Sequence, residues 1–149
     1  MSVDRNISLR IVTKREQFSD LFIDFVKGFL AEDPTFEMTS VAKDDTDLMD
    51  GIVFNDFESL KEVLDYRQHK KYHTSVTIYS ENIGEAIYIG AEKYSSSPAR
   101  FSLDISPGVG KRIPDSERIT DYGFYLCWII PRLMELDCSI YEVVCKDEG

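Results

Sequence analysis

The chain has 149 residues, of which 43% are hydrophobic, 12% aromatic and 30% charged, and its net charge is −10. This is the composition of a single globular domain, residues 1–149, and the aromatic content excludes an intrinsically disordered chain. Residues 1–16 lack the apolar core of a signal peptide, and no later stretch reaches the roughly 18 apolar residues of a membrane span. We therefore expect a cytoplasmic protein without a membrane partner.

The acidity is concentrated in one region, residues 31–58. This region holds nine carboxylates and one base, whereas the other 121 residues carry 18 acids and 16 bases. A negative field repels nucleic acid and attracts basic protein surfaces. The charge distribution therefore favours a protein partner and argues against a nucleic-acid partner.

The first predicted elements are a strand and a helix. Apolar residues alternate with polar ones over 7–12, which predicts the strand. Thr13 and Glu16 have the spacing of a capping box, which predicts a helix start. The helix is expected to contribute to the core through an apolar stripe: Phe18, Leu21, Phe22, Phe25, Val26, Phe29 and Leu30.

The acidic region begins near Pro34, which is expected to end this helix. A strand is predicted within 35–42, and a polar loop over 43–51. A second helix is predicted to begin at an Asn55 cap and to end near residue 68. The basic cluster 67–73 would then lie at the carboxyl end of that helix, where solvated cations complement the helix dipole.

The second half of the chain contains most of the predicted strands, which cover 73–80, 85–91, 100–105 and 139–145. The stretch 120–136 is apolar almost all the way round, which favours a buried helix that Pro131 kinks or restarts. A strand followed by a helix is the alternative for this stretch. Consecutive hairpin-linked strands predict an α+β domain with an antiparallel or mixed sheet and about three helices packed on it.

The sequence contains no complete catalytic or metal-binding motif. An EF-hand loop that began at Asp45 would have Met49 where an oxygen ligand is needed and Asp50 where glycine is needed. His69 and His73 have helical i, i+4 spacing, but no third zinc ligand lies near them in the sequence. The three cysteines are expected to be reduced and mostly buried. We expect a protein that is not an enzyme and has no metal and no cofactor.

The acidic region also carries apolar residues, and this combination is typical of a protein-binding patch. Six carboxylates are predicted to attract a partner: Asp44, Asp45, Asp47, Asp50, Asp56 and Glu58. Three apolar side chains among them are predicted to anchor it: Phe36, Met49 and Phe54.

In overall character, as a small acidic α+β domain without catalytic motifs, the chain resembles the immunity proteins of bacterial toxin systems. This resemblance rests on the whole chain and transfers no binding residue. It implies a one-to-one complex with a cognate protein toxin that has a basic surface, such as a nuclease, and inhibition of that toxin. Attraction between opposite fields would then accelerate association, to about 10⁸ M⁻¹ s⁻¹ or more.

Two other interpretations compete with this one. The first is a small-molecule-binding or enzymatic α+β domain with a pocket between sheet and helices, lined by tyrosines: Tyr72, Tyr79, Tyr88, Tyr94, Tyr122 and Tyr125. The second is a scaffold subunit that associates with itself through residues 31–58. No feature of the sequence fixes the oligomeric state.

Overall fold

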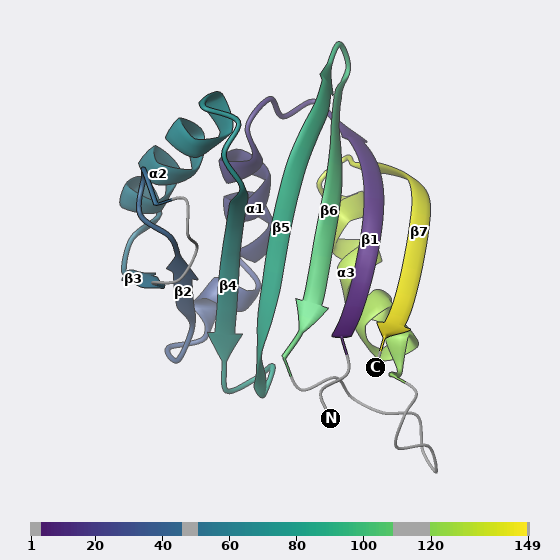
Figure 1. Cartoon of the computed structure of the whole chain (residues 1–149). Helices are drawn as coiled ribbons and strands as arrows, with labels where there is room; N and C mark the ends of the chain where they lie inside the picture. The colour runs from purple at the N-terminus through teal and green to yellow at the C-terminus, as the bar shows by residue number, and fades with distance from the viewer. Residues whose placement is uncertain (1–3, 46–50, 109–119, 149) are drawn as a thin grey trace.

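The fold is one antiparallel sheet with three α-helices on one of its faces (Figure 1). The computed structural model describes residues 4–45, 51–108 and 120–148. In these residues seven strands form the sheet in the order β3-β2-β4-β5-β6-β1-β7. The strands are β1 (Asp4–Thr13), β2 (Glu37–Ser40), β3 (Ile52–Phe54), β4 (Thr74–Ser80), β5 (Glu85–Ser96), β6 (Ala99–Pro107) and β7 (Ser139–Glu148). The predicted α+β class is confirmed.

The helices are α1 (Phe18–Val26), α2 (Phe57–His69) and α3 (Tyr122–Glu135), with a short 3₁₀ turn, η1 (Leu30–Glu32), after α1. In Figure 1 all three helices lie behind the sheet, α2 near β3 and α3 near β7. No helix of the described residues covers the other face of the sheet. No helix in the described ranges is long and apolar enough to cross a membrane.

The core lies between the sheet and the helices, because the strands alternate between the two faces. On β6, Phe101, Leu103 and Ile105 are at most 3% exposed, while Ser102 and Asp104 point to the open face. β1 contributes Ile7, Leu9 and Ile11, all fully buried. The alternation of apolar residues that predicted these strands therefore also identifies the face of the sheet that is buried.

The capping-box prediction for α1 is wrong. Thr13 is the last residue of β1, and its Oγ1 accepts a hydrogen bond from the Arg15 N–H. α1 instead begins after Gln17, and the Phe18 N–H donates to Oε1 of Gln68 on α2 at 2.8 Å. A side chain that is distant in the sequence therefore satisfies this helix end, which no local motif could indicate.

The predicted extent of α1 and its apolar stripe also need correction. The helix ends at Val26, because Lys27 is already extended, with a φ of −68° and a ψ of 134°, and Gly28 follows with a φ of 73°, which a glycine adopts readily. Phe29 therefore leaves the helix and is 43% exposed, whereas Phe18, Phe22 and Phe25 are buried. Every residue of the predicted stripe except Phe29 belongs to the core.

The stretch 120–136 contains one helix, α3, with Pro131 inside it, so the strand alternative is wrong. The helix is also not buried all round. Tyr125, Ile129 and Leu133 are at most 2% exposed, but Phe124 is 36% and Met134 is 62% exposed. α3 therefore has a buried side and an apolar exposed side.

Candidate partner-binding surface

Only some of the residues predicted to bind a partner line a common groove. A groove of about 670 Å³ runs between η1, β2, β3 and the start of α2. We call it the acidic groove and define it by the six lining residues that matter most: Asp33, Phe36, Glu37, Phe54, Asp56 and Tyr79. Glu37 and Tyr79 are directly paired across β2 and β4, which fixes them side by side.

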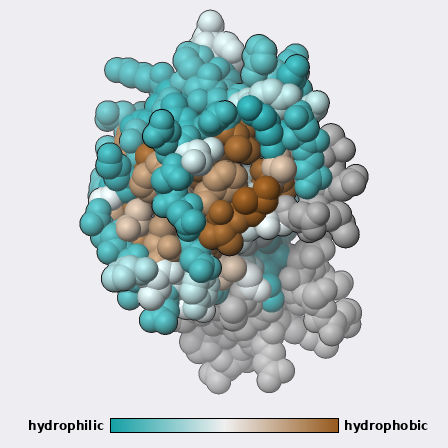
Figure 2. Space-filling view, turned by 90° about the vertical axis from the view of Figure 1, so that its left-hand side faces the viewer, coloured by the Kyte–Doolittle hydropathy of each residue, from teal (hydrophilic) through white to brown (hydrophobic). Residues whose placement is uncertain are grey.

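The acidic groove lies beside exposed apolar surface. Ile52 and Val53 on β3 are 41% and 55% exposed. Figure 2 looks onto the side of the molecule that carries β3 and α2, and it shows apolar surface in the middle of that side with hydrophilic residues around it. Apolar surface inside a polar rim is the usual anatomy of a protein-binding patch.

All charged side chains among the described lining residues of the acidic groove are acidic: Asp33, Glu37 and Asp56. The Thr35 N–H and hydroxyl both donate to Asp33 Oδ1, at 2.9 and 2.8 Å, and these hydrogen bonds lower the pKa of the Asp33 carboxyl. The Ser59 N–H, at 2.7 Å, and the Ser59 hydroxyl lower the pKa of Asp56 in the same way. Both carboxylates therefore keep their negative charge in mildly acidic solution.

Asp56, and not Asn55, is the cap of α2. Asp56 has extended backbone angles, and its side chain accepts from the Ser59 N–H, as an N-cap aspartate does. The predicted cap residue is therefore wrong by one position. Asp56 has two roles in this structure, since it begins α2 and also contributes negative charge to the acidic groove.

The predicted acids Asp44 and Asp45 lie away from the acidic groove, near the carboxyl half of α2. The Tyr66 hydroxyl donates to Asp44 Oδ1 at 2.6 Å, and this hydrogen bond raises the pKa of Tyr66. Beside it, the Arg67 guanidinium donates to the backbone carbonyls of residues 42, 43 and 45 and to that of residue 73, at 2.7 to 3.3 Å. These contacts hold the segment 42–45 against α2.

Arg67 corrects the prediction of a solvated basic cluster over 67–73. Arg67 is only 1% exposed, so it belongs to the interior of the protein. The guanidinium lies 5.5 Å from the centre of the Tyr72 ring and satisfies four backbone acceptors. The sequence pattern could not separate this buried cation from its exposed neighbours Lys70 and Lys71.

The structure brings three of the predicted site residues together in the acidic groove: Phe36, Phe54 and Asp56. Glu58 is exposed on the first turn of α2 but does not line the groove. Asp47, Met49 and Asp50 lie outside the described residues. The prediction missed Asp33, Glu37 and Tyr79, because it followed the density of acids in 44–58 and not the turn at Pro34 that brings Asp33 and Glu37 beside β3.

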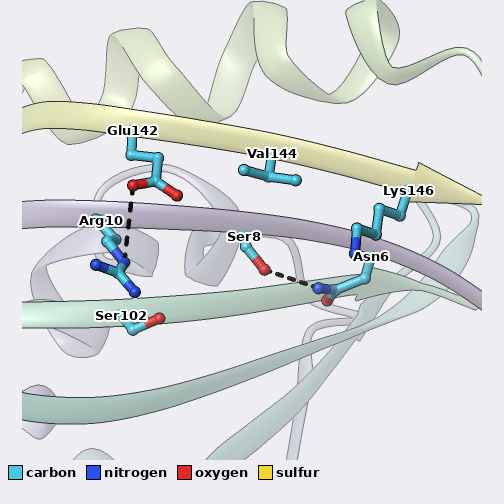
Figure 3. Close-up of a pocket in the computed structure, with 7 residues that line it drawn as sticks. All are labelled: Asn6, Ser8, Arg10, Ser102, Glu142, Val144 and Lys146. Atoms are coloured by element: carbon cyan, nitrogen blue, oxygen red, sulfur yellow. Dashed lines mark hydrogen bonds and ion pairs between the residues drawn. The ribbon is translucent and has the colours of Figure 1, made fainter.

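Two other hollows on the described surface have mixed charge. A trough on the open face of β1, β6 and β7 has a volume of about 380 Å³, and Figure 3 labels the residues that line it. In it Arg10 Nε lies 3.9 Å from Glu142 Oε2, and Lys146 lies nearby. A groove of about 710 Å³ beside Tyr72 and Tyr94 likewise contains both acids and bases. Neither hollow has the single sign of charge found in the acidic groove.

The small-molecule pocket predicted between sheet and helices stays a prediction. Two hollows lie there: an apolar void of about 20 Å³ against Phe22, Leu103 and Leu133, and the mixed-charge groove of about 710 Å³, which Phe18 of α1 and Gln68 of α2 line together with residues of β4, β5 and β6. The tyrosines proposed to line such a pocket are dispersed. Tyr72 and Tyr94 share the groove of about 710 Å³ and Tyr79 lines the acidic groove, while Tyr125 is buried and its hydroxyl donates to Glu85 Oε2 at 2.8 Å.

The described residues also form no group of three histidines, cysteines or acids able to hold a metal ion. His73 stacks on the Tyr88 ring and interacts with its hydroxyl, and burial lowers the pKa of His73. All three cysteines are free. Cys138 is buried and Cys145 is half-buried, as expected, whereas Cys127 is exposed.

Comparison with known proteins adds no relative: no family model, curated protein or solved structure matches this chain.

Proposed function

We propose that the protein is a cytoplasmic binding protein that inhibits a cationic partner protein, in the manner of an immunity protein that neutralises a cognate toxin. The observation that carries this proposal is the acidic groove, where three carboxylates and four aromatic rings line one hollow. The resemblance to immunity proteins supplies the biological setting. The proposal needs no catalytic residue and no cofactor.

The chemistry of the acidic groove fits a lysine or arginine side chain of the partner. The aliphatic stem of such a residue would pack on Phe36 and Phe54, and its charged head would meet the carboxylates of Asp33, Glu37 and Asp56. The Tyr79 ring, 39% exposed, offers a face for a cation–π contact. Because Asp33 and Asp56 have lowered pKa values, this attraction would persist in mildly acidic solution.

The experiment uses the full chain as bait, identifies the captured protein by mass spectrometry and then measures binding kinetics and inhibition with the purified partner. Glu37→Lys should weaken binding at least tenfold, because it places a cation where the partner's cation binds. Glu92→Lys is the matched control, since Glu92 is also an exposed strand residue but lines the mixed groove beside Tyr94. It should change binding less than threefold.

A purified partner that binds the two variants equally well would contradict the proposal, because both changes alter the net charge by the same amount. A partner with an acidic binding surface would contradict it as well. The association rate of the wild-type protein should also fall as salt is added, since exposed charges are screened over about 10 Å at 0.1 M salt.

A further inference from the structure

α3 has two apolar sides, and the core uses only one of them. Tyr125, Ile129 and Leu133 pack against the sheet and the other helices and are at most 2% exposed. A second set of apolar residues is exposed, and we call it the outer stripe: Phe124, Cys127, Pro131 and Met134. At about 100° per residue the two sets lie on opposite sides of the helix.

The residues of the outer stripe are exposed and do not contribute to the core. Phe124 contacts Tyr125 edge-on, with 5.1 Å between ring centres, but Met134 is 62% exposed and lies at the far end of the helix. Phe29, 43% exposed, extends the apolar surface, because its ring lies 6.1 Å from that of Trp128 on α3. Connected apolar surface of this kind on a soluble protein marks a contact site.

The outer stripe carries no charge, in a protein whose net charge is −10. The charges nearest to it are already engaged: Arg132 donates to the carbonyls of Asp24, Phe25 and Lys27 and pairs with Glu135 at 3.0 Å. Two acidic copies of one chain repel each other unless they meet through an uncharged surface. The outer stripe provides such a surface.

We propose that the outer stripe binds the outer stripe of a second copy, with the two α3 helices antiparallel about a two-fold axis. The spacings within the stripe are three, four and three residues, so they read the same in both directions. An antiparallel pair therefore places Phe124 opposite Met134 of the second copy, and Cys127 opposite Pro131. A symmetric dimer requires this self-complementarity, and the spacing is that of helices packed side by side.

This dimer is independent of the proposed function. In Figure 1, α3 lies behind β6, β1 and β7, while β3 and α2 lie at the other edge of the sheet. The part of the acidic groove on β2, β3 and α2 therefore lies away from the dimer contact, and the two surfaces come closest at Asp33, which also lines a hollow of about 360 Å³ with Phe124 and Trp128.

Sedimentation velocity over a range of protein concentrations tests the proposal. The wild-type chain should form a dimer, and Phe124→Lys or Met134→Glu alone should raise the dimer dissociation constant at least tenfold. The double variant, Phe124→Lys with Met134→Glu, should restore the dimer, because position 124 of one copy faces position 134 of the other. Val53→Glu, at an exposed apolar site on β3, is the control that should leave the dimer unchanged.

A wild-type chain that stays monomeric at high micromolar concentration would overturn the proposal. A dimer that survives Met134→Glu would also overturn it, because the contact would then lie elsewhere. Failure of the double variant to restore the dimer, with its fold intact by circular dichroism, would overturn the antiparallel arrangement. A short bis-maleimide should in addition link wild-type copies through the exposed Cys127, and failure to do so while Cys127 is modified would count against the pairing.

Discussion

The two edges of the sheet are built from different interactions. At the β3 edge the strands are short, three residues in β3 and four in β2. Hydrogen bonds that Arg67 donates, and others that Asp56 and Asp33 accept, hold the surrounding segments. At the β7 edge, β7 pairs with β1 along almost its whole length, and α3 packs beside it. The first edge therefore depends mainly on charged and polar side chains, whereas the second combines long backbone pairing and apolar contacts with the hydrogen bonds that Thr120 and Tyr122 donate to Asp147.

The carboxylates at the β3 edge have two roles. Asp33 and Asp56 give the acidic groove its negative field, and they also accept backbone hydrogen bonds that order their own segments. A partner that binds this edge would therefore meet carboxylates that the fold has already positioned. The outer stripe of α3, in contrast, presents apolar side chains.

The largest expected effect concerns the buried cation of the β3 edge. Arg67→Met leaves four backbone carbonyls without their donor, so it should lower the free energy of unfolding by about 3–5 kcal/mol. Urea unfolding measures this loss. Lys70→Met is the matched control on the next turn, where the residue is exposed, and should change stability by less than about 0.5 kcal/mol. Equal effects of the two changes would show that Arg67 does not hold this edge.

The next effect concerns Tyr122, at the β7 edge. Its hydroxyl donates to the Lys146 carbonyl and to Asp147 Oδ1, and burial together with the Asp147 carboxylate raises the pKa of Tyr122 from 10.0 to about 12. Because the folded-state pKa is the higher one, the stabilisation is complete below pH 10 and is lost as the pH rises from about 10 to 12. Tyr122→Phe should cost roughly 1–2 kcal/mol at pH 7.

The measurement for Tyr122 is urea unfolding at pH 7, 10 and 11. The difference between wild type and Tyr122→Phe should shrink at the highest pH. Tyr141→Phe serves as the control, because Tyr141 lies on β7, the strand that carries the acceptors of the Tyr122 hydroxyl, and is 47% exposed. A constant difference across this pH range would contradict the assigned role of the hydroxyl.

The smallest expected effect compares the two helix caps. Asp56 begins α2 and Asp121 begins α3, and each accepts from the N–H three residues later, at 2.7 and 3.1 Å. Asp56→Ala and Asp121→Ala should each lower the melting temperature by a few degrees at pH 7. The pKa of Asp56 is lowered in the folded state, so its contribution is present above the ordinary aspartate pKa of about 4 and is lost as the pH falls through the lower folded value.

The two cap residues should differ in their effect on partner binding, because they lie at different edges of the sheet. Asp56→Ala should slow association with a cationic partner, and Asp121→Ala should leave it unchanged, since only Asp56 lines the acidic groove. Melting curves at pH 7 and pH 3, together with association rates, give both readouts. Equal association rates for the two variants would remove Asp56 from the binding surface.

The sequence predicted the long strands well and the short edge poorly. β4, β5 and β6 have a clear period-two pattern because one face is buried and the other exposed. β3 has three residues, too few to show a period, and two of them are exposed. The start of α1 could not be found either, since its first N–H is satisfied by Gln68 from another helix.

The candidate site was predicted only in part, for a similar reason. Charge density along the sequence pointed to 44–58, and Asp56, Phe36 and Phe54 do line the acidic groove. Asp44 and Asp45 have the same sequence signal but are held against α2 through Tyr66 and Arg67. Local composition measures where acids are frequent, whereas a groove depends on which segments the fold places side by side.

The position of β1 within the sheet has a consequence for biosynthesis. β1 pairs with β6 and β7, whose residues begin at Ala99 and Ser139, so Ile7, Leu9 and Ile11 find their neighbours only after most of the polypeptide has left the ribosome. Until then this apolar segment is open to aggregation, and we expect the native sheet to assemble after translation and at the slow rate of distant strand pairing.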